Sequence, residues 1–209
     1  LDQSKSMAYS SQKISKLDYA KTLSASLAYL MLKQQDAVGL TLFDSKIQSS
    51  IPPKSKSNHI NSLFKIMEDI NPGPDTEIGN ILHLSADTIK KRGLVIIISD
   101  FLDDLESIMS GIKHYRYKGH EVIVFHILDN QELQLDFSER TQFIDLETNE
   151  SITTDPWHIR ESYQEGMQNF CNDMKINCRK NKVDYTLMNT NQPIEVALFD
   201  YLIKRKNII

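Results

Sequence analysis

The sequence predicts an α/β protein in which a mostly parallel, Rossmann-like sheet is flanked by helices on both faces. Two continuous runs of apolar, largely β-branched residues, at 93–100 (GLVIIISD) and 120–128 (HEVIVFHIL), are typical of buried parallel strands. Segments with helical periodicity alternate with these strands along the chain, and such alternation is typical of a parallel sheet.

The first part of the chain predicts a helix, a hairpin and two more helices. Apolar residues recur at intervals of three and four over 16–33, which indicates an amphipathic helix. The apolar run 37–43 and the alternating run 46–51 predict a hairpin at the sheet edge, ended by two prolines. Two helices are expected at 55–70 and 77–91, and a Pro- and Gly-rich loop at 71–76 joins them.

The second part of the chain adds an insertion to this pattern. A helix over 104–118 separates the two central strands, and two short strands around a polar turn predict a β-hairpin at 141–155. A long helix, a strand and a closing helix follow at 156–181, 183–189 and 193–205. We expect a single domain over 1–209, with the hairpin as an insertion in it.

Composition excludes several classes of protein. The 209 residues are 40% hydrophobic and carry a net charge of −4, so they can bury one core and offer no general basic field for nucleic acid. No apolar run approaches the ~18 residues that span a membrane. Cys171 and Cys178 stand seven apart in a predicted helix, roughly 10 Å, which is too far for a disulfide. We therefore expect reduced core cysteines and a cytoplasmic protein.

Oxygen-bearing side chains are predicted to converge at the carboxyl ends of the strands, where open parallel sheets bind ligands. Asp100 ends a central strand, Thr76 lies in the loop before a helix, and the opening DQSKS places Asp2, Ser4 and Ser6 at alternate positions. A set of hard oxygens without histidine or thiolate suits Mg²⁺, Mn²⁺ or Ca²⁺ and disfavours Zn²⁺. Taken alone, DQSKS could equally form a turn or a helix cap, and Thr76 could simply cap the helix that follows it.

The other polar residues are expected to have structural roles rather than to bind a ligand. Asp44 follows a strand and is expected in a turn, while Asp103 and Asp104 are expected to cap the next helix and favour its dipole. The six histidines show no spacing typical of metal ligands, so packing or surface roles are expected for them.

The five oxygen-bearing residues resemble the metal-ion-dependent adhesion site of von Willebrand factor A domains. The stretches that carry the resemblance extend from Asp2 to about Lys206 and are similar to the bacterial branch catalogued as domain of unknown function fifty-eight. Among them are DQSKSM, GLVIIISDFLDD, GHEVIVFHILDNQELQLDF and VDYTLMNTNQPIEVALFDYL. The resemblance implies direct or near-direct metal contact by Ser4, Ser6 and Thr76, and direct or water-mediated contact by Asp2 and Asp100.

The resemblance also implies a function. In the wider superfamily an exchangeable position on the metal accepts an Asp or Glu carboxylate from a partner protein, and members of this branch are often associated with MoxR-type AAA ATPases. The expected function is therefore a non-enzymatic, metal-dependent protein-binding module that acts as a co-chaperone or assembly factor. Family members carry a strand ahead of the first motif, so this strand is expected upstream of Leu1.

Two alternatives to a binding module stay open. A Mg²⁺-dependent phosphatase or phosphotransferase would also place Asp at strand ends, although Ser4 stands where dehalogenase-like enzymes need a second Asp and no GxxxxGK[ST] loop occurs. The other alternative is a scaffold with a vestigial site that binds nothing.

Overall fold

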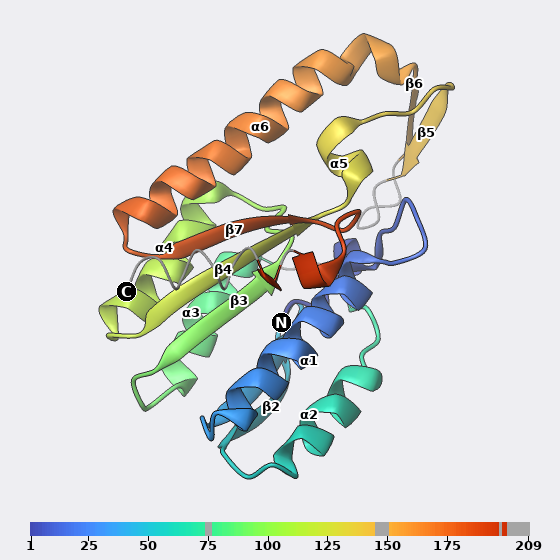
Figure 1. Ribbon diagram of the computed structural model, residues 1–209. Helices are drawn as coiled ribbons and strands as arrows, with labels where there is room; N and C mark the ends of the chain where they lie inside the picture. Colours follow the sequence, from blue (N-terminus) through green and yellow to red (C-terminus); the bar gives the residue numbers. More distant parts are fainter. Residues whose placement is uncertain (74–76, 145–150, 197, 200–209) are drawn as a thin grey trace.

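The structure is a computed structural model of the chain, which describes residues 1–73, 77–144, 151–196 and 198–199. Within these residues, the central sheet contains the parallel strands β3 (Leu94–Ser99), β4 (Glu121–Leu128) and β7 (Asp184–Asn189), in the order β3-β4-β7 (Figure 1). Every residue of β4 after Glu121 is buried, as its continuous apolar sequence predicts. The parallel register places Ser99 beside His126, so the carboxyl ends of β3 and β4 lie at the same edge.

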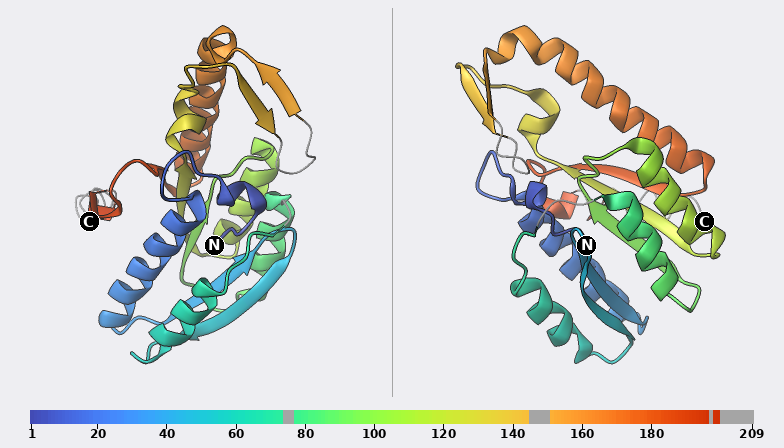
Figure 2. Two further views of the ribbon diagram at one scale, coloured as in Figure 1. Left: turned by 90° about the vertical axis from the view of Figure 1, so that its right-hand side faces the viewer. Right: turned by 180° about the vertical axis from the view of Figure 1, so that it is seen from behind.

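Helices pack on both faces of this sheet, as predicted (Figure 2). Successive residues of β3 face opposite cores, because side chains alternate along a strand. Ile98 packs with α1 and α2, and Ile97 packs with α3, α4 and α6. The bounds of the helices are Lys16–Lys33 (α1), His59–Glu68 (α2), Ile78–Thr88 (α3), Leu105–Tyr117 (α4) and Pro156–Lys180 (α6).

Two antiparallel hairpins accompany the parallel sheet, and both were predicted. The first joins β1 (Val38–Phe43) to β2 (Ile47–Lys54), and the second joins β5 (Thr141–Ile144) to β6 (Ser151–Thr154). β2 continues through its two prolines, where the prediction ended it, because an edge strand tolerates residues that cannot donate to a ladder. The mixed α/β prediction is therefore confirmed.

Two short helices were not predicted. The 3₁₀ helix η1 (Lys5–Ala8) and the helix α5 (Asn130–Gln134) have four and five residues, which is too short for a periodic apolar pattern. The predicted closing helix is helical at 194–196 and 198–199, and its remaining positions lie outside the described residues.

The first residues of the chain join the first hairpin to the central sheet. The backbone nitrogen of Asp2 donates to the Ile98 carbonyl at 3.0 Å, and that of Gln3 donates to the Phe43 carbonyl at 2.8 Å. Asp2 therefore lies between the carboxyl ends of β1 and β3, where it is only 2% exposed. This placement brings the opening motif to the edge at which open sheets bind ligands.

Two further expectations concern the long helix and the membrane. Cys171 and Cys178 are buried on α6 and both are free thiols, as predicted. Among the helices that the structure describes, none is long and apolar enough to cross a bilayer.

Candidate metal centre

Four of the five predicted ligands gather where β3 ends. The Asp2 carboxylate accepts a hydrogen bond from the Ser4 backbone nitrogen at 2.8 Å, and it lies close enough to Asp100 for the two charges to interact. Ser4 Oγ lies 3.1 Å from Ser6 Oγ. Thr76, the fifth predicted ligand, lies outside the described residues.

The distance between the two serine hydroxyls suits a small hard cation. Oxygens in adjacent positions of an octahedral Mg²⁺ shell lie about 3 Å apart, because each stands 2.0–2.1 Å from the ion. Ser4 Oγ and Ser6 Oγ are hydrogen-bonded to each other at 3.1 Å, which brings the two oxygens to a similar separation. In the described residues no three side chains of His, Cys, Asp or Glu form a metal-ligand group. Serine hydroxyls and carboxylates are the hard oxygen donors that Mg²⁺ prefers. The residues present therefore fit the implied ion.

Ser99 organises both carboxylates, although the sequence analysis did not single it out. Its hydroxyl donates to Asp2 Oδ2 at 2.6 Å and accepts from the Phe101 backbone nitrogen at 3.0 Å. Phe101 has a φ of 49°, a left-handed conformation that a bulky side chain rarely adopts and that its surroundings must hold. One hydroxyl thus orients Asp2 and stabilises the turn that presents Asp100. The available signal was a lone hydroxyl ending an otherwise apolar strand.

Burial and a neighbouring charge make Asp2 hold its proton more tightly than an ordinary carboxyl group does. Removal from water, reinforced by the negative charge of Asp100, raises the pKa of Asp2 to about 6, while hydrogen bonds from Ser99 and Ser4 oppose this shift. Two like charges at one buried site disfavour double ionisation. A divalent cation beside Asp2 would favour the carboxylate form and displace the proton.

Lys16 is a buried cation in the same cluster, and the sequence analysis missed it. Its Nζ lies 2.7 Å from Asp100 Oδ2 and 2.5 Å from Glu132 Oε1, and the side chain is wholly shielded from solvent. Burial alone would lower the pKa of Lys16, but attraction by the two carboxylates outweighs it and raises the pKa above its ordinary value. The available signal was that Lys16 stands in phase with the apolar face of α1, at Ala20, Leu23 and Leu27.

Glu132 connects this cluster to α5. Its second oxygen accepts from the Asp129 backbone nitrogen at 2.8 Å, and the Asp129 carboxylate accepts from the Gln131 nitrogen, which completes a capping box at the start of α5. Asp129 also accepts from the backbone nitrogen of Ser11 at 3.0 Å. The loop that follows DQSKS is therefore tied to the beginning of α5.

The loop that carries Thr76 is anchored at its first end by Gly73. The Gly73 nitrogen donates to the Gln3 carbonyl at 2.8 Å. Asp44 is wholly buried below it, where Gln3 and Gln48 side chains donate to its carboxylate. A Cβ at Gly73 would lie 1.9 Å from Asp44 Oδ2, so only glycine allows this approach. Asp44 is a turn residue as predicted, since its Oδ1 accepts from the Lys46 nitrogen at 3.2 Å, and its carboxylate also packs closely against Gly73.

The other end of the same loop is anchored by Asp103. Its Oδ2 accepts from the backbone nitrogen of Ile78, the first residue of α3, at 2.9 Å. Asp104 caps α4 as predicted, since its side chain accepts from the Ser107 nitrogen at 2.8 Å. Asp103 was predicted to cap α4 as well, but it serves α3 instead.

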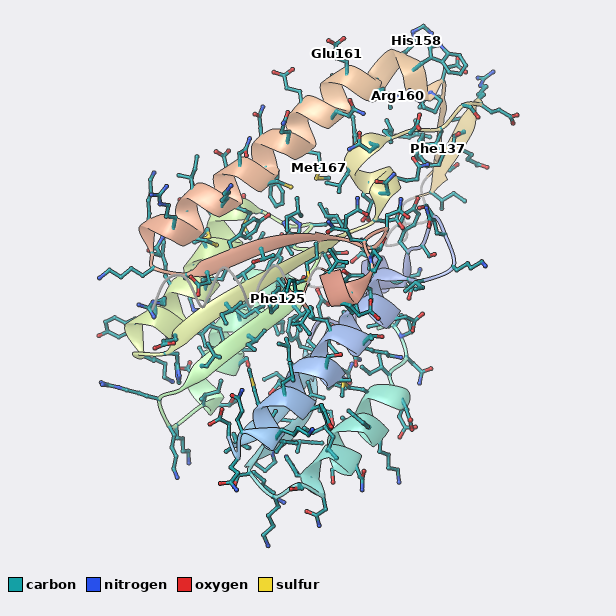
Figure 3. The ribbon with its side chains drawn as sticks, in the orientation of Figure 1. Phe125, Phe137, His158, Arg160, Glu161 and Met167 are labelled. Atoms are coloured by element: carbon teal, nitrogen blue, oxygen red, sulfur yellow. The ribbon has the colours of Figure 1, made fainter. Side chains whose placement is uncertain are left out.

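A surface cavity of about 420 Å³ lies beside the loop that follows Asp100. Its walls come from that loop and from α6, and Figure 3 shows Met167 on the inner side of this helix. The lining residues are Leu102, Asp103, Tyr163, Gly166, Met167 and Phe170. An apolar recess therefore stands within a few residues of a predicted metal ligand.

Comparison with known proteins shows the family of this chain. A family model described as "Protein of unknown function DUF58" matches residues 1–170. The chain belongs to this family. The matched range includes all five predicted metal ligands, as well as Lys16 and Glu132. No curated protein matches the chain.

Two solved structures from Bacteroides share the fold of this DUF58 chain. One, described as a conserved hypothetical protein BatB from Bacteroides thetaiotaomicron, is 19% identical, with a TM-score of 0.61 over 98% of this chain and 96% of the other. The second, described as an aerotolerance-related membrane protein from Bacteroides fragilis with multiple mutations to serines, is 19% identical, with a TM-score of 0.59 over 90% and 89%. At this identity the likeness concerns the fold alone.

Proposed function

We propose that this chain is a non-enzymatic, divalent-metal-dependent protein-binding module with a von Willebrand factor A arrangement. Ser4 and Ser6 hold Mg²⁺, or alternatively Mn²⁺ or Ca²⁺, through their hydroxyls, and Asp2 and Asp100 contribute directly or through water. Thr76 is the remaining proposed ligand. The observation that supports the proposal most is the pair of hydrogen-bonded hydroxyls, 3.1 Å apart, beside two buried carboxylates.

The chemistry of the ligand set indicates what the module binds. A bound ion would supply an electrophilic position for an incoming carboxylate, because neutral hydroxyls leave much of its charge uncompensated. We propose that a partner protein offers an Asp or Glu there and that an adjacent apolar side chain enters the recess beside Met167. A MoxR-type AAA ATPase is the proposed partner and the cytoplasm the proposed location.

A phosphatase is less well supported by the geometry. Both oxygens of Asp2 accept hydrogen bonds, from the Ser4 nitrogen and from Ser99 Oγ, and the residue is almost wholly buried. An attacking carboxylate needs a free oxygen that faces the substrate. In Asp2 both oxygens are instead held by hydrogen-bond donors of the protein.

Thermal unfolding tests the metal site. We expect Mg²⁺ at about 100 times its dissociation constant to stabilise the wild type by about 2.7 kcal/mol relative to EDTA. Asp2→Ala should not respond, whereas Asp173→Ala, which changes an exposed carboxylate on α6, should respond like the wild type. A full response by Asp2→Ala would place the ion elsewhere, and no response by any protein would favour the vestigial scaffold.

Binding of a purified MoxR-type ATPase tests the partner. Under the proposal, complex formation measured by calorimetry is lost on addition of EDTA and is restored by excess Mg²⁺. Equal affinity in both conditions would show that the metal, even if bound, does not carry the interaction.

A further inference from the structure

Lys16 places a positive charge inside the candidate centre. Its side chain is 0% exposed, and its two partners are also shielded, at 3% for Asp100 and 15% for Glu132. The ammonium is bonded to Oδ2 of Asp100, which is itself a predicted metal ligand. Charges held in such an environment are weakly screened by water and salt.

The charges of this cluster limit how strongly it attracts a cation. Asp100 and Glu132 flank the Lys16 ammonium, and Asp2 interacts with Asp100, so the four groups carry a net charge of −2 when all are ionised. A divalent ion at Asp100 would stand close to Nζ of Lys16 and be repelled by it. Glu132 accepts a hydrogen bond from the same ammonium, and its negative charge partly neutralises the positive charge that a metal ion at Asp100 would meet.

We propose that Lys16 is a built-in counter-cation of the metal centre, which weakens the binding of the divalent ion, and that Glu132 restores part of this affinity. This inference rests on the proposed function, since it concerns the same ion. The centre then holds its metal loosely in the free protein. A partner carboxylate adds the negative charge that Lys16 removes, so metal and partner bind more tightly together than separately.

A purely positioning role for Lys16 makes the opposite prediction. If the ammonium only held Asp100 in place, its removal would misplace a ligand and lower the affinity for metal. The sign of the change therefore separates the two roles.

Titration calorimetry of the whole chain with MgCl₂ alone, and in a second series with MnCl₂ alone, tests the inference. The variants are Lys16→Met, Glu132→Gln and the double variant, which change the net charge of the cluster from −2 to −3, −1 and −2. We expect Lys16→Met to bind at least about tenfold more tightly than the wild type, and Glu132→Gln about tenfold more weakly. The double variant should lie within about threefold of the wild type, and so should Lys16→Arg, which keeps the charge.

The ranking stays measurable if one variant fails to fold. Lys16→Met leaves two buried carboxylates without their ammonium. Glu132→Gln keeps the ion pair between Lys16 and Asp100, and the double variant removes one charge of each sign. Unchanged or tighter binding by Glu132→Gln, or strongly weakened binding by the double variant, would overturn the inference.

The same titrations separate failure of this inference from failure of the proposed function. A wild type that binds Mg²⁺ while Lys16→Met binds it equally or more weakly overturns the counter-cation alone. Absence of binding in every folded variant overturns both. Binding by Lys16→Met but not by the wild type supports the inference, because the ammonium then occupies the place of the ion.

Discussion

Three buried carboxylates show how single residues are made compatible with this interior. Asp2 accepts from Ser99 and Ser4, Asp44 accepts from two glutamine amides, and Asp100 pairs with Lys16. A buried carboxylate without such partners is costly. The partners of the three carboxylates differ in whether they carry a charge. Of these three, Asp100 is the one that pairs with a cationic side chain. Asp2 is neutralised by a proton or by an ion, which makes it the residue most sensitive to pH and metal.

Asp2 and His126 are expected to give opposite pH dependences of stability. Burial raises the pKa of Asp2 from 3.8 to about 6, so its contribution is complete below 3.8 and is lost as pH rises through 6. Burial lowers the pKa of His126 from 6.5 to about 4, so its contribution is complete above 6.5 and is lost as pH falls through 4. The two contributions therefore change stability in opposite directions between about pH 4 and 6.

Urea unfolding of two variants in EDTA across this pH range separates the two contributions to the pH dependence of the free energy of unfolding. Asp2→Asn should show stability that rises with pH more steeply than in the wild type, because the opposing Asp2 contribution is removed. His126→Phe should show stability that falls with pH, although it also loses the 2.7 Å contact of Nδ1 with the Tyr185 hydroxyl. Identical slopes in both variants would mean that neither group titrates as its surroundings predict.

Gly73 is expected to be the least replaceable glycine near the centre. Gly73→Ala forces Asp44 or the loop to move, so we expect a loss of about 1–3 kcal/mol in the free energy of unfolding and a smaller response to Mg²⁺. Gly93→Ala is the matched control, because no atom lies within 4 Å of its added Cβ. Equal stability of the two variants, measured by urea unfolding, would contradict the close approach of Asp44.

At the scale of elements, one loop caps two helices. Asp104 caps α4 from the adjacent position, whereas Asp103 reaches α3 across 25 residues of sequence. A helix begins with unpaired backbone N–H groups, and a carboxylate at that end satisfies one and favours the helix dipole. The Asp100 turn and the helix after Thr76 are therefore held together.

The two caps are expected to differ in their effect on metal binding. Asp103→Ala and Asp104→Ala should each cost about 1 kcal/mol in the free energy of unfolding. Only Asp103→Ala should reduce the stabilisation by Mg²⁺, because it releases the start of α3 from the Asp100 loop. Thermal melts with Mg²⁺ and with EDTA make the comparison, and an equal metal response would show that this cap does not position the centre.

At the scale of the whole molecule, β4 separates two apolar cores. Phe125 lies in the core with α1 and α2, and its neighbour Val124 lies in the core with α3, α4 and α6. The second hairpin stands apart from both. The segment that leads into the hairpin is held by α6, whose Arg160 donates to the carbonyls of Leu135 and Phe137 at 3.1 and 2.8 Å (Figure 3). We therefore expect substitutions in the second hairpin to have little effect on the free energy of unfolding.

Substitutions in these two regions should have very different costs. Phe125→Ala should lower the free energy of unfolding by about 3–5 kcal/mol, because the cavity cannot close within a packed core. Ile152→Ser on β6, where the side chain is 70% exposed, should change it by less than about 0.5 kcal/mol. Urea unfolding measures both, and a large effect of Ile152→Ser would show that the hairpin packs against the rest of the protein.

The sequence by itself determined the type and order of most elements. The β-branched runs of β3 and β4 and the apolar spacing of α1 are local patterns. Such runs are favourable as strands buried on both faces, and such spacing as a helix that buries one face. The same local patterns do not report α5, which is short, or the length of β2, which depends on its position at the sheet edge. The positions of Asp2, Ser4, Ser6 and Asp100 at one edge followed from strand polarity and from family resemblance together.

Only the tertiary structure decided which groups meet at the centre. Lys16 and Glu132 are 116 residues apart, Ser99 and Asp2 are 97 apart, and neither pair leaves a periodic trace in the sequence. Such pairs are set by which strand ends and helix starts share an edge of the sheet. The physical reason is that apolar burial acts on every apolar residue alike, whereas a buried charge is tolerated only where a specific partner reaches it.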